Sequence, residues 1–144
     1  MMNWIIVTSY GDAVKALENG ANSIDANHCH YRGKEQSFKV LAEALAINDT
    51  TTSLRIEGSL FQRVGPEGAK VLAATLKLNT TLTSLNLVGN VIRSIGAKTI
   101  SDALLTNTTI TCLNLRDNMI GAEGAKAIAN ALKVNNTLSE LKQV

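Results

Sequence analysis

Hydrophobic residues follow two alternating rhythms along most of the chain. In the first rhythm leucines stand two positions apart, as do Leu85 and Leu87, which places both side chains on one face of a β-strand. In the second rhythm apolar or small residues stand at positions i, i+3, i+4 and i+7, on one face of an α-helix. Four stretches have this helical spacing: Phe38, Leu41, Ala42, Leu45; Ala69, Leu72, Ala73, Leu76; Ala97, Ile100, Ser101, Leu104; and Ala125, Ile128, Ala129, Leu132.

The strand-like and helix-like stretches recur at a fixed period. Two series of residues keep a step of 28 positions: Asn79, Asn107, Asn135 and Leu85, Leu113, Leu141. Asn48 precedes Asn79 by 31 positions, so its unit carries three extra residues, which fall within EGSLFQRVGPEG, before the helix. A fixed period of this size predicts stacked supersecondary units.

A strand, a turn and a helix repeated in one direction predict an α/β fold with a parallel sheet and helices on one side. Helices are wider than the ~4.8 Å that separates strands, so the stack curves. The strands then line the concave face and the helices the convex face of a solenoid.

The segments LTSLNLVGN and ITCLNLRDN resemble the leucine-rich-repeat consensus L-x-x-L-x-L-x-x-N. The period of 28 residues and the helix GAKAIANALK are similar to the ribonuclease-inhibitor-like subfamily. The resemblance covers residues 36–144. It implies a leucine-rich-repeat solenoid in which Asn90 and Asn118 hydrogen-bond the neighbouring backbone in a ladder along the stack.

Residues 1–35 fit the repeat less well, and we predict that they form an N-terminal cap. Residues 4–7 would be an extra strand or cover, GDAVKALENGA a helix with Asp12 as its N-cap, and SIDAN a degenerate first strand. The stretch VKALENGANSIDA also resembles the end of an ankyrin repeat. We prefer the cap because terminal units of solenoids are atypical. Residues 36–144 are then the repeats, ending on an uncapped strand.

Composition narrows the class of function. The sequence contains only five aromatic residues, so the hydrophobic core must consist of Leu, Ile, Val and Ala. A net charge of +2 favours neither nucleic acid nor a membrane surface as a partner. The apolar run at residues 4–7 is too short for a membrane span and lacks the flanks of a signal peptide. We therefore expect a cytoplasmic protein, or one secreted without a classical signal peptide into a host cytosol.

Few residues are candidates for metal binding or catalysis. HCHYRG holds His28, Cys29 and His30, but Cys112 would lie three strands away, ~14 Å at ~4.8 Å per strand. We therefore expect no metal site and two free thiols. No phosphate-binding loop and no nucleophile–base arrangement is visible, so we expect no cofactor and no enzyme.

Four N-x-T sequons begin at one repeat position, just past each helix: Asn48, Asn79, Asn107 and Asn135. An asparagine there can adopt a left-handed conformation that ends the helix. We expect that structural role rather than glycosylation.

Residues between the strand leucines should form rows on the concave face. The predicted rows are Ser53, Ser84, Cys112, Glu140; Arg55, Asn86, Asn114, Lys142; and Glu57, Val88, Arg116, Val144. We expect a polar face of mixed charge without aromatic residues. It is either simply solvated or a protein-binding surface anchored by Arg55, Glu57 and Arg116, since arginine is enriched at binding hot spots. In the insertion, Leu60, Phe61 and Arg63 would offer a second surface or fold onto the neighbouring unit.

The resemblance implies partner binding without catalysis, as in inhibitors, innate immune receptors and secreted effectors of intracellular bacteria. The Asn/Thr-rich units are most similar to the effectors. Two alternatives remain open. Some similar proteins activate small GTPases, although those are longer and carry an acidic tail. The chain could also self-assemble as a homodimer through the unpaired edge of its last strand, at Leu138, Leu141 and Val144.

Overall fold

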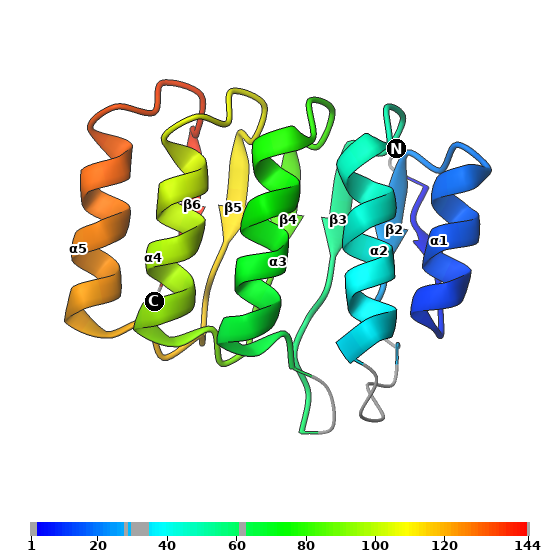
Figure 1. Ribbon diagram of the computed structural model, residues 1–144, viewed down its shortest axis with the longest axis horizontal. Helices are drawn as coiled ribbons and strands as arrows, with labels where there is room; N and C mark the ends of the chain where they lie inside the picture. The colour runs from blue at the N-terminus through cyan, green and yellow to red at the C-terminus, as the bar shows by residue number, and fades with distance from the viewer. Residues whose placement is uncertain (1–2, 28, 30–34, 61–62, 144) are drawn as a thin grey trace.

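Strands and helices alternate along the chain in the computed structural model, which describes residues 3–27, 29, 35–60 and 63–143 (Figure 1). The elements are β1 (Ile5–Ile6), α1 (Tyr10–Glu18), β2 (Ser23–Asp25), α2 (Glu35–Ile47), β3 (Ser53–Arg55), α3 (Gly65–Leu78), β4 (Ser84–Asn86), α4 (Arg93–Leu104), β5 (Cys112–Asn114), α5 (Gly121–Leu132) and β6 (Glu140–Lys142).

The strands form one open sheet in the order β1-β2-β3-β4-β5-β6, and every neighbouring pair is parallel. The five helices stand side by side in a single layer on one face of this sheet (Figure 1). The predicted α/β architecture is therefore confirmed. We call the sheet face without helices the concave face.

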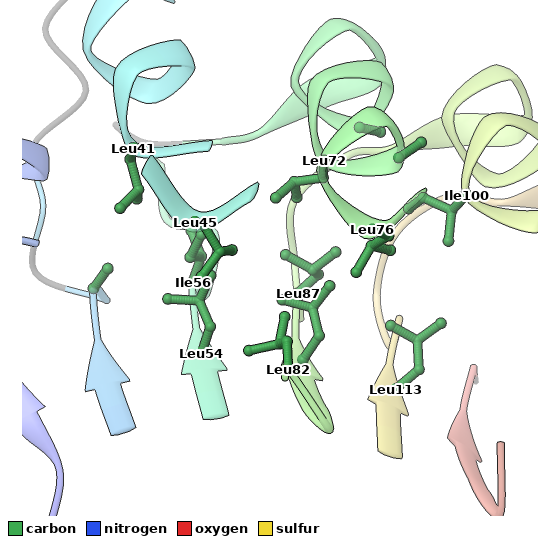
Figure 2. Packing of buried hydrophobic residues seen from close by; sticks show 14 of the residues in the cluster. Leu41, Leu45, Leu54, Ile56, Leu72, Leu76, Leu82, Leu87, Ile100 and Leu113 are labelled. Atoms are coloured by element: carbon green, nitrogen blue, oxygen red, sulfur yellow. The ribbon is translucent and has the colours of Figure 1, made fainter. Parts of the chain in front are cut away.

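The core is a row of aliphatic layers between the sheet and the helices. Figure 2 shows leucine and isoleucine side chains of the helices and of the strands meeting there. Leu54, Leu85 and Leu113 hold equivalent strand positions, and each is at most 1% exposed. Three of the four predicted helical stripes are buried, on α2, α3 and α4. On α5 the prediction is wrong in part, because Ala129 is exposed and Leu132 is 38% exposed where no described element packs outside them.

A ladder of side-chain hydrogen bonds follows the ends of the strands and includes a cysteine. Asn90 and Asn118 lie five positions after the central leucine of their strands, and each donates from Nδ2 to the first carbonyl past the preceding strand, at 2.6 and 2.7 Å. Asn118 Oδ1 also accepts from the backbone N of Asn90, at 2.9 Å. Cys29 holds the same position after Ile24, and its Sγ donates to the first carbonyl past the preceding strand at 3.8 Å. The acceptors are the carbonyl groups of Ile56, Leu87 and Val7, respectively.

The sequon asparagines form a second ladder, and their predicted left-handed conformation is wrong. Asn79 has φ −72° and ψ 132°, and none of the four is among the residues with positive φ. Asn79 Oδ1 accepts from the backbone N of Leu82 at 2.7 Å, and its Nδ2 donates to Leu45 O, in the last turn of α2, at 2.7 Å. The side-chain amide of Asn79 thus provides a hydrogen-bond donor for a carbonyl at the end of the preceding helix, which has no partner within that helix. Asn48, Asn107 and Asn135 make the equivalent bonds.

The N-terminal residues add a complete unit to the same sheet. β1 pairs with β2, as predicted for an extra strand, and α1 lies between them in the chain. The N-cap of α1 is Ser9 rather than Asp12, because Ser9 Oγ accepts from the Asp12 backbone N at 3.0 Å. Asp12 instead binds the Ser9 hydroxyl at 2.7 Å. The division of the chain at residue 35 stays a prediction.

Helices α2 and α3 are held differently from the pairs that follow. Phe38 of α2 stands where α3 and α4 carry Ala69 and Ala97. A Cβ added to Gly96 would meet Ala69 Cβ at 2.9 Å, so α3 and α4 touch through small residues. Phe38 acts as a wedge, and two cavities of ≈ 340 Å³ each lie along the groove between α2 and α3. Both cavities are lined by Lys39, Lys70 and Val71.

Candidate functional site

The concave rows lie where the repeat placed them. Strand pairing aligns Ser53, Ser84, Cys112 and Glu140, and likewise Arg55, Asn86, Asn114 and Lys142. The third row continues past the strand ends with Glu57, Val88 and Arg116, whereas Val144 lies outside the described residues. The structure thus brings the predicted residues onto one face, as in-register parallel strands require.

The N-terminal part of this face is a charged network around Arg55. Its Nη1 lies 3.3 Å from Asp25 Oδ2, and its Nε lies 3.9 Å from Glu57 Oε1. Asn86 Nδ2 donates to Glu57 Oε1 at 3.0 Å and fixes this carboxylate in turn. The side chains of Arg55 and Asp25 are 35% and 12% exposed, so solvent screens this pair less than a fully exposed one. The guanidinium is consequently held in one orientation.

An aromatic ring on the same face corrects the expectation of a surface without aromatic residues. The guanidinium carbon of Arg55 lies over the Trp4 ring, 4.5 Å from its centroid, in a cation–π contact. Ile6 pairs in register with Asp25 and is 63% exposed. Because side chains alternate along a strand, Trp4 and Ile6 project from the same face. We call Trp4, Ile6, Arg55, Glu57 and Asn86 the N-terminal patch.

The sequence pattern only weakly indicates that Trp4 and Ile6 belong to the concave face. β1 has only two residues and lacks the leucine pattern of the repeats, so its register against β2 could not be read from the period. The parallel pairing of Ile5 with Ile24 sets that register.

The C-terminal part of the face carries a separate polar cluster. Lys142 Nζ lies 2.9 Å from Glu140 Oε1, and Cys112 Sγ donates to Glu140 Oε2 at 3.4 Å. Lys142 lowers the pKa of Glu140, and Glu140 raises the pKa of Lys142. Burial, followed by the hydrogen bond to Glu140, raises the pKa of Cys112. Asn114 Oδ1 accepts from the Arg116 backbone N at 3.2 Å, and the Arg116 side chain is exposed.

Among its described residues, the insertion between β3 and α3 has a bulky apolar side chain that is exposed to solvent. Leu60 is 84% exposed rather than folded onto the neighbouring unit. Arg63 is exposed, and its Nε donates to Ser59 O at 3.1 Å, which closes the loop on itself. Phe61, the third predicted residue, lies outside the described residues.

The described part of the chain offers no cluster of three or more His, Cys, Asp or Glu residues that would hold a metal ion. His28 and His30 lie outside it. Cys29 is fully buried, and burial raises the pKa of its thiol to about 12. Among the same described residues, the helices are all too short or too polar to span a bilayer.

Comparisons with known proteins agree with this architecture. The model of the family described as Leucine Rich repeat matches residues 78–101 and 106–129. No curated protein sequence matches the chain. Among solved structures, "Leiomodin-1 Actin-Binding Site 2 (ABS2)" is similar with TM-score 0.81 and 28% identity, over 94% of this chain and 79% of that chain. The tropomodulin C-terminal domain of Caenorhabditis elegans is similar with TM-score 0.77 and 13% identity, over 95% of this chain and 83% of that chain. The repeats, the open parallel sheet and these similarities identify the fold as an α/β leucine-rich-repeat solenoid.

Proposed function

We propose that the chain is a non-catalytic protein-binding module and that the N-terminal patch is its main contact surface. The observation that carries the proposal is the Arg55 guanidinium, which lies over Trp4 between two carboxylates. Tryptophan and arginine are the residue types most enriched among binding hot spots. A partner that covered them would desolvate a cation–π pair, which strengthens such contacts.

Preorganisation supports this choice of surface. Ordering a side chain on binding costs about 0.5–1.5 kcal/mol, and Arg55 is already ordered by Asp25 and Glu57. Ile6 adds an exposed apolar side chain to the same face, while Glu57 and Asn86 form a polar rim. The C-terminal part of the face has an exposed ion pair instead, and such pairs contribute little.

Actin is the first partner that we propose to test. The leiomodin-1 structure is described as an actin-binding site, and it shares 28% identity with this chain over 94% of this chain and 79% of its own length. A leucine-rich-repeat fold alone would not single out a partner, because function lies in the surface that a fold carries.

Titration of fluorescently labelled monomeric actin with the chain and its variants tests both statements. We expect Arg55→Ala to weaken binding at least about 30-fold, which corresponds to the ~2 kcal/mol of a hot spot. Arg116→Ala is the matched control on the same face and should change the Kd less than about threefold. A wild-type chain that does not bind would reject actin, and equal effects of the two substitutions would reject the N-terminal patch.

Regulation of a small GTPase is a separate proposal with its own measurement. It requires that the chain accelerate nucleotide hydrolysis by a candidate GTPase in a single-turnover assay, whereas simple binding leaves the rate unchanged. The origin as a bacterial effector and the location in the cytoplasm or in a host cytosol stay predictions.

A further inference from the structure

We propose that a second copy of this chain pairs, antiparallel, with the outer edge of β6. The last described layer is less covered than the layer before it. Ile110 and Leu113 are 0% exposed, whereas Leu138 and Leu141, at the equivalent positions, are only half-buried. β6 is the outermost strand of the sheet, and no described element pairs with its outer side. This surface lies at the opposite end of the sheet from the N-terminal patch, so the inference goes beyond the proposed function.

The backbone of β6 defines the centre of such a pair. Glu140 N donates to Thr111 O at 2.9 Å, and Lys142 O accepts from Leu115 N at 2.7 Å. Residues 140 and 142 therefore direct their backbone groups toward the rest of the sheet, and alternation directs those of Leu141 outward. In an antiparallel ladder two opposed residues exchange both of their hydrogen bonds. Leu141 facing Leu141 of a second copy, across a two-fold axis, meets this requirement.

The side chains match the same register. With Leu141 at the two-fold axis, Glu140 of one copy stands opposite Lys142 of the other, and the reverse pair forms with it. Both residues project from the concave face, where unlike charges directly opposite each other stabilise an antiparallel pair. A closed two-fold interface is self-complementary in this way. A parallel, head-to-tail contact of β6 with β1 would instead place Glu140 beside Trp4 and Lys142 beside Ile6, without any charge match.

The helix layer fits the same arrangement. The outer side of α5 carries small or apolar residues at Ala122, Ala125, Ala129 and Leu132. Their counterparts in α4 face α5: a Cβ added to Gly124 would meet Ala97 Cβ at 3.0 Å and Ser94 Cα at 3.2 Å.

Sedimentation velocity of this chain over a wide concentration range tests the proposal. We expect the wild type to pass from monomer to dimer as its concentration rises. Glu140→Lys alone places lysines opposite one another, and Lys142→Glu alone places glutamates opposite one another, so each variant should remain monomeric. An equimolar mixture of the two single variants should form a heterodimer, because every opposed pair is then unlike in charge.

Two further samples keep the outcome decisive. Both substitutions in one chain should restore the homodimer, and Lys126→Glu, an exposed change on α5, should leave dimerisation unchanged. Circular dichroism checks that each variant is folded. A wild type that stays monomeric up to several hundred micromolar overturns the proposal, and so does a single variant that dimerises like the wild type. Arg55→Ala should leave the dimer intact, so failure of the proposed function is separable from failure of this interface.

Discussion

The position of Cys29 in the stack of repeats determines the hydrogen bond and the pKa of its thiol. Cys29 occupies the place that asparagine holds at Asn90 and Asn118, and it donates to the equivalent carbonyl, Val7 O. The thiol supplies one hydrogen bond to this carbonyl, and it is a weaker donor than the amide of asparagine. Burial is the main cause that raises its pKa to about 12, and the negative charges of Asp12 and Asp25 add to it.

The raised pKa predicts a pH dependence of stability. In the folded chain the thiol stays protonated up to about pH 12, whereas in the unfolded chain it ionises near its ordinary pKa of 9.0. The unfolded state therefore releases the proton first, and the free energy of unfolding falls as pH rises from 9 toward 12, by at most about 1.4 kcal/mol per pH unit.

Urea denaturation of the wild type and of Cys29→Asn at pH 8 and pH 10.5, with reductant, measures this effect. Asparagine retains the donor but does not titrate, so the variant should lose less stability than the wild type over this interval. Parallel losses in the two proteins would contradict a protonated Cys29 in the folded state.

At the scale of the elements, the helix layer has one irregular junction. α3, α4 and α5 approach one another through glycine and alanine, as the contact of Gly96 with Ala69 shows. Between α2 and α3 the aromatic ring of Phe38 replaces the alanine and lies at an angle of 69° to the ring of Tyr10, with centroids 5.5 Å apart. Phe38 thus joins α1, α2 and α3, and the groove beside it follows from its size.

Truncation of this wedge should be costly. Phe38 is 4% exposed, so Phe38→Ala should lower the free energy of unfolding by about 3–5 kcal/mol through lost burial and a new cavity. Urea denaturation gives the value, and Val40→Ala, at a position 42% exposed on the same helix, is the control with an expected loss below about 1 kcal/mol. A small loss for Phe38→Ala would mean that α2 and α3 move together and fill the space of the lost ring. They would then pack as closely as α3 and α4 do.

The whole molecule is a quasi-one-dimensional stack, so its stability should vary along its length. Each unit contacts only its neighbours, and an outer unit has one neighbour instead of two. α4 buries Ile100 and Leu104 fully, whereas Leu132, the counterpart of Leu104 in α5, is 38% exposed. Local opening should therefore begin at the C-terminal unit.

Native-state hydrogen exchange, at a concentration that keeps the chain monomeric, tests this gradient. Amides of α5 and β6 should exchange at least tenfold faster than those of α4 and β4, since tenfold corresponds to about 1.4 kcal/mol in opening free energy. Uniform protection from β2 to β6 would show that the stack opens only as one cooperative unit.

The sequence by itself determined the repeat and much of what the repeat implies. The leucine alternation and the helical stripes predicted the strands, the helices and the rows of the concave face, because each depends on the geometry of a single element. The asparagine ladder followed from the family consensus. The tertiary structure decided which faces meet across units about 30 positions apart, as the bonds from Asn79 to the carbonyls of α2 show. Trp4 over Arg55, Cys29 as a ladder residue, the extended conformation of Asn79 and the open outer face of α5 all depend on a neighbouring unit, or on its absence from the described chain. A local pattern defines the face of an element, but only stacking determines what that face contacts.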